Sequence, residues 1–245
     1  MFGDRVVETW TCSWDRRRDC VKSVRRGMLG AMPLYEKPVP AEAGDCVRAM
    51  LEGVRAKGVD NLPCWTKDAL QMRARINFLH RATGGEWPQV DGPALIEAIE
   101  GFVGGMTKWR DLERLDISAA MDLILMRSGH DRRELDRLAP PKMEVPSGSR
   151  MTIHYDGDEP TVEVRLQECF GLMETPKVAG GRVPVVMTLL SPAHRPIQVT
   201  KDLAGFWRGA YQLVRKDMRG RYPRHDWPED PLSATPSFRR KRGAT

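Results

Sequence analysis

The chain has 245 residues, of which 41% are hydrophobic and 29% charged, a balance that is typical of folded globular proteins and excludes an intrinsically disordered chain. It contains no apolar run near the roughly 18 residues of a membrane span and no apolar signal segment at its start. The five cysteines are scattered without a C-x-x-C pair, so neither a disulfide framework nor a zinc site is expected, and we predict a cytoplasmic protein without a membrane partner.

The first segment, residues 1–37, is predicted to be a small β-meander. Apolar residues at even positions alternate with threonine and serine along residues 6–14, which is typical of a strand. The charged run at 15–19 predicts a turn, and Gly27 is expected to end the second strand. Three strands with one apolar face are marginally stable alone, so we expect this sheet to be completed by further sequence.

Pro38 and Pro40 mark a linker, after which residues 41–139 predict a helical block. Apolar residues at three-and-four spacing, together with capping residues, predict its helices. Their expected ranges are 66–83, with Thr66 as the N-cap, 91–102, 111–127 and 131–138.

The last folded segment, residues 140–232, predicts a mixed domain of strands and helix. The strands are expected at 143–145, 150–155, 161–165, 183–190 and 197–199. One final helix is expected to begin at Thr200 as its N-cap and to end near Gly220. Residues 233–245 predict a disordered basic tail. The predicted fold class is therefore α+β, with an N-terminal β-meander, a central helical block and a C-terminal strand-helix domain.

The formal net charge of +6 is concentrated near the C-terminus. Residues 195–224 contain eight basic and two acidic residues, and the tail adds Arg239, Arg240, Lys241 and Arg242, whereas residues 1–194 are close to neutral. A local excess of positive charge is typical of a surface that faces a polyanion.

The final helix is the main candidate site. Its arginines share one face, and guanidinium groups match phosphate well. The candidate nucleic-acid-binding residues of this region are Arg208, Arg215, Lys216, Arg219, Arg221 and Arg224. Tyr211 or Tyr222 could add a stacking surface, whereas Phe206 and Trp207 are expected in the core. The same arginines would also suit a solvated face or contacts with carboxylates of the protein.

The two glycines of this helix, Gly205 and Gly209, each cost about 1 kcal/mol of helix propensity relative to alanine. They lie one turn apart on one face. We expect that they allow the close approach of another backbone, and we favour a protein backbone over RNA.

The turn of the β-meander supplies a second candidate set, Arg16, Arg17 and Arg18. These arginines could contact a single strand, although a solvated turn explains them equally well. Trp10 and Trp14 share a strand face there, and we expect that face to be buried.

No catalytic or metal-binding residues are predicted. The sequence contains no G-x-x-x-x-G-K-[ST] phosphate loop and no D-E-x-H motif, and its five histidines are isolated. The glycine-rich residues 179–182 and the acidic residues 156–159 are both interpreted as turns.

Four segments in this order resemble one known family. They read EVPSGSR at 144–150, RLQECFG at 165–171, GGRVPVVMTLLSP at 180–192 and PIQVTKDLAGFWRGAYQLVRKDMRGRYPRHDWPEDP at 196–231. Together they are similar to the C-terminal signature of bacterial HrpB-type DEAH-box ATP-dependent RNA helicases, with a looser likeness before residue 139.

The resemblance implies that residues 1–37 end an OB-fold-like element and that the two RecA-like motor domains lie upstream. It implies ATP and Mg²⁺ as cofactors of the parent helicase and none in this chain. The expected function is an accessory module that binds RNA or another single-stranded nucleic acid, with the RecA-like core as its partner in cis. The alternative is a scaffolding module that docks on that core, or on another partner, without touching RNA.

Overall fold

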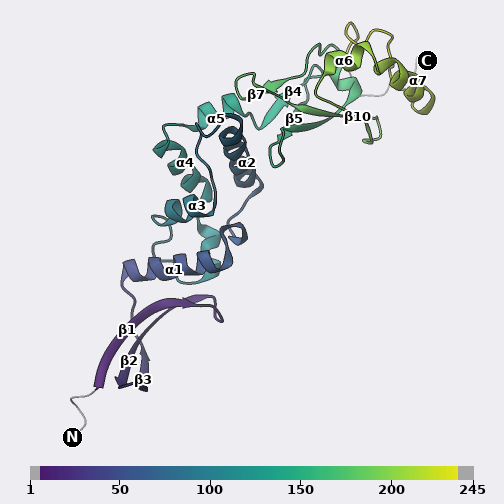
Figure 1. The fold of residues 1–245 in the computed structure, drawn as a ribbon. Coiled ribbons are helices and arrows are strands. Elements are labelled where there is room, and N and C mark those ends of the chain that lie inside the picture. Colours follow the sequence, from purple (N-terminus) through teal and green to yellow (C-terminus); the bar gives the residue numbers. More distant parts are fainter. Residues whose placement is uncertain (1–5, 237–245) are drawn as a thin grey trace. The chain divides into compact units, whose positions relative to one another are not determined.

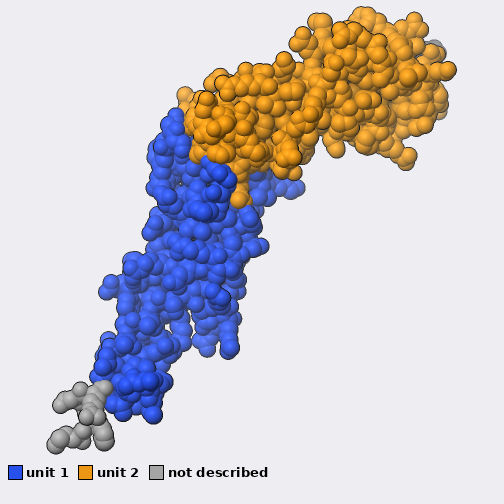
Figure 2. Space-filling model, viewed as in Figure 1, with its two compact units in different colours: residues 1–70, 89–129 blue, residues 71–88, 130–245 orange. Residues whose placement is uncertain are grey.

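The structure is a computed structural model that describes residues 6–236 (Figure 1). The chain forms two compact units (Figure 2). One contains the described residues up to 70 together with 89–129, and the other contains 71–88 and the described residues from 130 onward. The described chain contains helices together with three separate, mostly antiparallel sheets, so the predicted α+β class is confirmed.

The first unit begins with a three-stranded antiparallel sheet in the order β1-β2-β3. Its strands are β1 (Val6–Asp15), β2 (Cys20–Leu29) and β3 (Met32–Pro38). The predicted meander is therefore confirmed, whereas its attribution to an OB-fold stays a prediction. The expected strand break at Gly27 is wrong, since β2 continues through this residue and the next turn lies at Gly30 with a φ of 60°.

Gly27 is needed for packing across the sheet. A Cβ at this position would overlap the ring of Tyr35 on β3. The strand register also shifts between Gly27 and Met28, which is the signature of a bulge. The missing side chain therefore admits the tyrosine ring and does not end the strand.

A segment from the helical part continues the sheet where β3 stops. The β2–β3 pairing ends at Val24, and beside the first residues of β2 lie Thr107 and Trp109. The amide of Val21 donates to the carbonyl of Thr107 at 2.7 Å, and the amide of Trp109 donates to the carbonyl of Asp19 at 2.9 Å. These bonds explain why the sheet and the first helices form one unit and do not separate at residue 37.

Trp14 fixes helix α1 (Ala43–Lys57) against the sheet. A Cβ on Gly53 of α1 would lie 2.5 Å from Cδ2 of Trp14, so the indole rests directly on the helix backbone. Trp14 is 9% exposed and meets the edge of Trp109 at 6.3 Å between ring centroids. Lys57 lies 4.5 Å from the centre of the Trp109 ring and pairs with Asp19 at 2.8 Å.

The remaining helices of the first unit surround an apolar core that includes Met50, Val54, Ile99 and Met121. They are the 3₁₀ turn Val59–Asn61, α3 (Gly92–Ile99), the 3₁₀ turn Trp109–Arg114 and α4 (Ile117–Arg127). The unit boundary falls within α2 (Lys67–Ala82), whose predicted cap is confirmed by the 3.1 Å bond from the Ala69 amide to the Thr66 hydroxyl.

The single helix expected over residues 111–127 is wrong. Leu115 has extended backbone between the 3₁₀ turn and α4. The side chain of Asp116 then accepts a hydrogen bond from the Ala119 amide at 3.0 Å and caps a new helix. The carboxylate at 116 competes with helix continuation by satisfying an amide at a fresh N-terminus.

The second unit contains a five-stranded sheet in the order β10-β9-β6-β5-β4. Its strands are β4 (Lys142–Glu144), β5 (Arg150–His154), β6 (Thr161–Arg165), β9 (Val186–Leu190) and β10 (Pro196–Thr200). Only β6 and β9 pair in parallel among these strands. The small ribbon of β7 (Lys177–Val178) and β8 (Val183–Pro184), the 3₁₀ turn Leu166–Cys169 and the helices α5 (Arg132–Leu138), α6 (Leu203–Arg208) and α7 (Tyr211–Arg221) complete the unit.

The second half of α2 is tied to this unit by buried polar contacts. Arg75 is 7% exposed, and its guanidinium pairs with Asp136 and donates to the carbonyl of Ala139. Gln71 donates to the carbonyl of Pro141 at 3.1 Å. A buried guanidinium is tolerated only with such partners, so these contacts explain why residues 71–88 group with α5 and the strands and not with the helices of the first unit.

Both predicted turns are confirmed. Ala179, Gly180 and Gly181 have positive φ values of 52°, 66° and 86° between β7 and β8. Residues 156–159 join the antiparallel strands β5 and β6.

We predict that Gly53→Ala destabilises the first unit. The added methyl group would collide with Trp14, and overpacking of this kind costs about 1–3 kcal/mol. Urea unfolding of the full chain should show a lower midpoint. Gly44→Ala is the matched control, since it lies in the same helix and its Cβ would meet no atom within 4 Å. Equal midpoints for the two variants would contradict the packing described for Trp14.

His130 is surrounded by hydrogen-bond acceptors in the second unit. Its ring stacks on Trp87 at 4.1 Å, and its nitrogens contact Glu134 at 2.8 Å and the carbonyl of Glu86 at 3.2 Å. Burial opposes the charged ring, but the hydrogen bonds to Glu134 and Glu86 dominate and raise the pKa of His130 above its ordinary value.

This raised pKa predicts a loss of stability on the alkaline side. The contribution of His130 is fully present below the unfolded-state pKa of about 6.5 and disappears as pH rises through the higher folded-state pKa. His130→Gln should therefore flatten the fall in unfolding free energy with rising pH. His154→Gln, a change at an exposed position of β5, should leave that fall as it is. Unfolding curves at a series of pH values measure the effect, and an unchanged slope for His130→Gln would contradict it.

Candidate nucleic-acid interface

The helix predicted from Thr200 to near Gly220 is two helices, α6 and α7. The predicted cap at Thr200 is wrong because the N-cap of α6 is Asp202, whose carboxylate accepts from the Gly205 amide at 2.8 Å. Gly209 then ends α6 with φ −114° and ψ −86°. The bend allows the two short helices to present different faces to the same apolar core.

The two glycines serve this local geometry. A Cβ at Gly205 would overlap the carboxylate of Asp202, so this position must be small for the cap to form. A Cβ at Gly209 would lie 3.3 Å from the carbonyl oxygen of Gly205, which belongs to the same turn. The expectation that a separate backbone approaches these residues is therefore wrong for the described part of the chain.

An aromatic cluster lies beneath α6 and α7. Trp207 and Tyr211 meet edge to face at 5.3 Å, and Phe206 and Phe170 pack beside them. Phe206 and Trp207 are in the core as predicted, at 5% exposure each. Tyr211 is fully buried and donates to the carbonyl of Pro228 at 2.8 Å, so it offers no stacking surface. Burial raises the pKa of Tyr211 to about 12.

Residues 222–232, here called the return segment, run back along α7. Arg215 holds it there, with Nε donating to the carbonyl of Trp227 and Nη2 pairing with Glu229, both at 2.9 Å. Gln212 adds a bond to the Glu229 carbonyl at 3.0 Å. The Arg215 side chain is only 16% exposed, so its guanidinium is engaged within the protein and is not available to an external phosphate.

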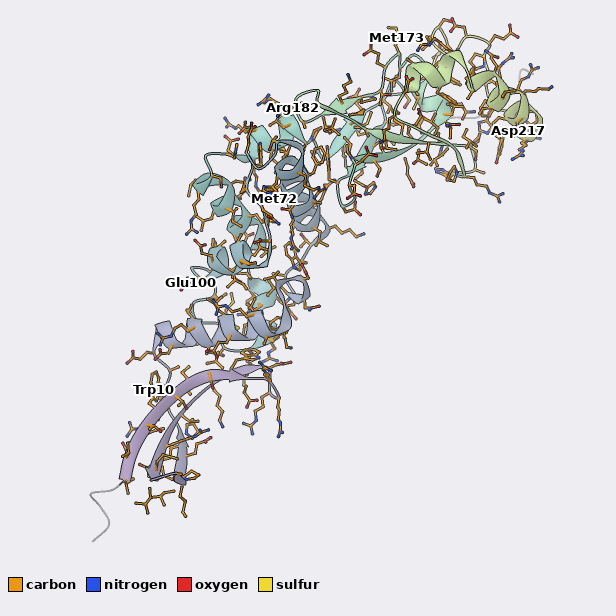
Figure 3. All side chains as sticks on the ribbon, in the orientation of Figure 1. Trp10, Met72, Glu100, Met173, Arg182 and Asp217 are labelled. Carbon is orange, nitrogen blue, oxygen red and sulfur yellow. The ribbon has the colours of Figure 1, made fainter. Side chains whose placement is uncertain are left out.

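The other predicted cations of this region stay at the surface. Arg208 ends α6, Lys216 and Arg219 lie on the exposed side of α7, and Arg224 follows in the return segment. Figure 3 labels Asp217 on α7 among the side chains of this end of the unit. Asp217 pairs with Arg221 at 3.0 Å, but both side chains are at least half exposed, so the pair is weak and screened.

We name Arg208, Lys216, Arg219, Arg221 and Arg224 the α7 basic surface. Among the described residues, only Arg221 of this set has a carboxylate partner at salt-bridge distance. The predicted basic tail, Arg239 to Arg242, lies outside the described residues.

The second candidate set lies on the turn between β1 and β2. Arg16, Arg17 and Arg18 are all exposed. The carboxylate of Asp15 accepts from the amides of Arg17 and Arg18 at 2.9 and 3.2 Å, and these bonds lower the pKa of Asp15. The turn is therefore fixed by its backbone while its arginine side chains remain in solvent.

The structure adds two cations that the sequence analysis missed. Lys108 forms an isolated antiparallel β-bridge with Cys20, and the amide of the next residue, Trp109, donates to the Asp19 carbonyl of the turn. Lys108 and Arg110, on either side of Trp109, are both exposed. About ninety positions separate these residues from the arginine turn in the sequence, so no local pattern could join them. We name Arg16, Arg17, Arg18, Lys108 and Arg110 the turn basic surface.

The strand tryptophans of this unit differ in exposure. Trp14 is buried as expected, but Trp10 is 41% exposed, which corrects the prediction that both lie in the core. Trp14 packs on α1 at Gly53, whereas the more exposed Trp10 donates from its Nε1 to the Ser23 hydroxyl at 3.1 Å.

Comparison with known proteins shows which family the chain belongs to. The family model described as "ATP-dependent helicase C-terminal", for the HrpB C-terminal region, matches residues 99–231. The ATP-dependent RNA helicase HrpB of Escherichia coli is 39% identical over an alignment of 244 residues, and the match covers 97% of this chain. The chain belongs to the HrpB family.

Two crystal structures of E. coli HrpB are also similar to this HrpB-family chain. One, described as a DExH-box NTPase, has a TM-score of 0.76 at 38% identity and covers 97% of this chain. The other, described as a DEAH/RHA helicase, has a TM-score of 0.64 at 36% identity and covers 91%. The predicted resemblance to HrpB-type helicases is therefore confirmed.

The match to HrpB covers a limited share of the relatives. The chain spans 30% of the length of the E. coli helicase and 29–30% of the chains in the two crystal structures. The matched family region contains the four sequence segments that carried the resemblance, together with α6, α7 and most of the return segment.

Within residues 6–236, no three histidine, cysteine, aspartate or glutamate side chains gather in a way that could hold a metal ion. Over the same range, no helix combines the length and the apolar composition that crossing a bilayer requires.

We predict that Arg215→Met loosens the return segment. The change leaves the Trp227 carbonyl and Glu229 without their donor, and losing hydrogen bonds to a charged group costs about 1.5–3 kcal/mol. Limited proteolysis should show faster cleavage within 222–232, and urea unfolding should show a lower midpoint. Arg219→Met removes the same charge from the exposed side of α7 and is the matched control. Equal protection in both variants would show that Arg215 does not hold the segment.

Proposed function

We propose that this chain is a nucleic-acid-binding accessory module of an HrpB-type helicase, in which the α7 basic surface contacts the phosphate backbone of RNA. The observation that carries the proposal is that Arg208, Lys216, Arg219 and Arg224 are exposed, whereas Arg215 is engaged within the protein. Charged groups that the fold does not use remain available to a polyanion.

The form of the surface favours RNA backbone over base recognition. The aromatic side chains of α6 and α7 are buried, so stacking contributes little there. Contacts made only by guanidinium and ammonium groups are insensitive to sequence and depend on salt. The turn basic surface of the other unit has the same character and, with exposed Trp10 on the same sheet, would suit a single strand.

The catalytic step belongs to the rest of the helicase in this proposal. The sequence has no phosphate loop for a nucleotide, so ATP and Mg²⁺ would bind the RecA-like core, with which this module would act in cis. This HrpB-family chain spans 30% of its E. coli relative, which leaves most of that protein for the motor.

One observation favours docking on protein instead. Leu213 on α7 is 76% exposed, and Met173 elsewhere in the same unit is 67% exposed. Apolar groups gain nothing from phosphate but bury favourably against protein. Leu213→Ser in the full-length helicase would weaken association of the module with the motor domains if this surface docks on protein, and would leave RNA affinity unchanged.

The purified chain should bind short single-stranded and duplex RNA weakly, with affinity falling as salt rises. Arg219→Glu should reduce affinity and flatten the slope of log K against log salt by about 0.7 for single strands and about 0.9 for duplex, as expected for one lost phosphate contact. Fluorescence anisotropy at several salt concentrations measures both values.

Arg133→Glu supplies the matched control because it makes the same charge change at an exposed position on α5. Arg133→Glu should lower RNA affinity only slightly, through the change in net charge, and by the same factor for every RNA. The proposal fails if the chain does not bind RNA at low salt, or if Arg133→Glu weakens binding as much as Arg219→Glu.

A further inference from the structure

Strands β5 and β6 separate before they end. They pair only at Ile153 and His154 of β5. Residues 150–152 of β5 pair with β4 along the opposite edge of the strand. Within the described sheet they have no partner in β6, and residues 163–165 of β6 have none in β5. The sheet therefore opens between two strands that are neighbours in its order, and the interval is not filled by another strand.

A pocket of about 300 Å³ occupies this opening. Ser149 and Met151 line the β5 side, and Glu163 and Arg165 line the β6 side. Glu168, Leu190 and His194 complete the wall. The volume is at the lower end of the range of small-molecule pockets. The lining combines apolar side chains with both hydrogen-bond donors and hydrogen-bond acceptors.

Two carboxylates supply the acceptors. Glu163 is exposed on β6, whereas Glu168 is only 5% exposed. The hydroxyl of Ser147 donates to Oε1 of Glu168 at 3.2 Å. A carboxylate has about four lone-pair positions, so this single hydroxyl leaves room for further donors. Burying a carboxylate without hydrogen-bond partners is costly, so its remaining acceptor positions favour a ligand that carries donors.

A fixed guanidinium supplies the donors. Arg165 Nη2 donates to Nε2 of His194 at 2.7 Å, and this imidazole nitrogen must therefore be unprotonated. His194 has a φ of 58°, and its amide donates to the Ser191 carbonyl at 2.9 Å, which fixes it in the turn between β9 and β10. The imidazole thus orients the planar fork of Arg165 at the pocket wall.

Guanine is the nucleobase whose edges match this arrangement. Its N1–H and N2–H₂ groups are adjacent donors, which a carboxylate accepts, and its O6 and N7 atoms are adjacent acceptors, which arginine binds bidentately. Adenine, cytosine and uracil each place an acceptor beside a donor on the pairing edge, so a carboxylate would face a lone pair. Unpaired RNA bases are commonly read on these edges after leaving the stack.

We propose that the pocket between β5 and β6 binds a guanine base, with Glu163 and Glu168 as acceptors and Arg165 as donor. The base can belong to a free nucleotide or to an unpaired position in RNA. In the second case the pocket rests on the proposed function and adds a base preference to a module whose other contacts are with the RNA backbone.

Mononucleotides test the pocket without the RNA proposal. Isothermal titration of the full chain should give saturable binding of GMP that is about tenfold tighter than that of AMP, CMP or UMP, since one good pairing discriminates by about 1–3 kcal/mol. Inosine monophosphate lacks the N2 amino group and 7-deaza-GMP lacks N7, so each should bind more weakly than GMP. Equal affinities across these nucleotides, or no saturable binding of GMP, would overturn the proposal.

A conservative variant locates the effect. Glu163→Gln keeps the size of the side chain but turns one acceptor into a donor, so the preference for GMP over AMP should disappear. Glu144→Gln is the control, because this exposed glutamate lies on β4 and does not line the pocket. A GMP preference that survives Glu163→Gln, or that both variants lose equally, counts against the site.

RNA titrations separate the two sources of guanine. A heptamer of uridine with one central guanosine should bind more tightly than heptauridine if the pocket reads RNA, and equally if it takes only free nucleotide. Heptauridine binding without any preference for guanine in either assay overturns the pocket and keeps the proposed function. GMP preference without heptauridine binding at low salt keeps the pocket and overturns the proposed function.

Discussion

The bond between Arg215 and the return segment is the constraint on which the C-terminal surface depends. Its guanidinium takes the carbonyl of Trp227 and the carboxylate of Glu229, and the aromatic cluster fills the space beneath. One arginine of α7 is thereby bound within the protein, and Glu229 of the return segment is fixed relative to the helix. The remaining cations point to solvent. The surface therefore consists of cations that the fold does not use, because among the basic residues of α7 it is Arg215 that makes the bonds to the return segment.

The other unit reaches a comparable result by a different route. There the backbone is fixed by Asp15 and by the segment at 107–109, while the arginine side chains of the turn make none of these bonds. Long-range pairing also brings Lys108 and Arg110 to the same place. In both units the groups that fix the geometry differ from the exposed cations, as the proposed contact with a flexible polyanion requires.

Local patterns predicted the elements well where the chain follows local rules. Alternation gave the meander, paired turn residues gave the connections at 156–159 and 179–182, and Thr66 capped its helix as expected. The errors in where two helices begin share one physical origin. Asp116 and Asp202 each begin a helix inside or after a region whose apolar spacing suggests continuity, because a side-chain cap competes with the helix hydrogen bond. The exposure and contacts of some individual side chains could not be predicted from local sequence. Neither the engagement of Arg215, nor the exposure of Trp10, nor the meeting of Lys108 with the arginine turn can be read from nearby residues, since each depends on contacts between distant parts of the chain.

The strand-like contact at residues 107–109 has a consequence for how this protein could be divided or recombined. A break between residues 37 and 41 looks natural from composition, yet it would leave the Thr107 carbonyl and the Trp109 amide without their partners on β2 and the Gly53 face of α1 without its indole cover. The meander is therefore not an interchangeable cassette. Homologous exchange at that point would succeed only if the incoming sheet brought a tryptophan and a free strand edge of the same kind, so the two segments are constrained to evolve together.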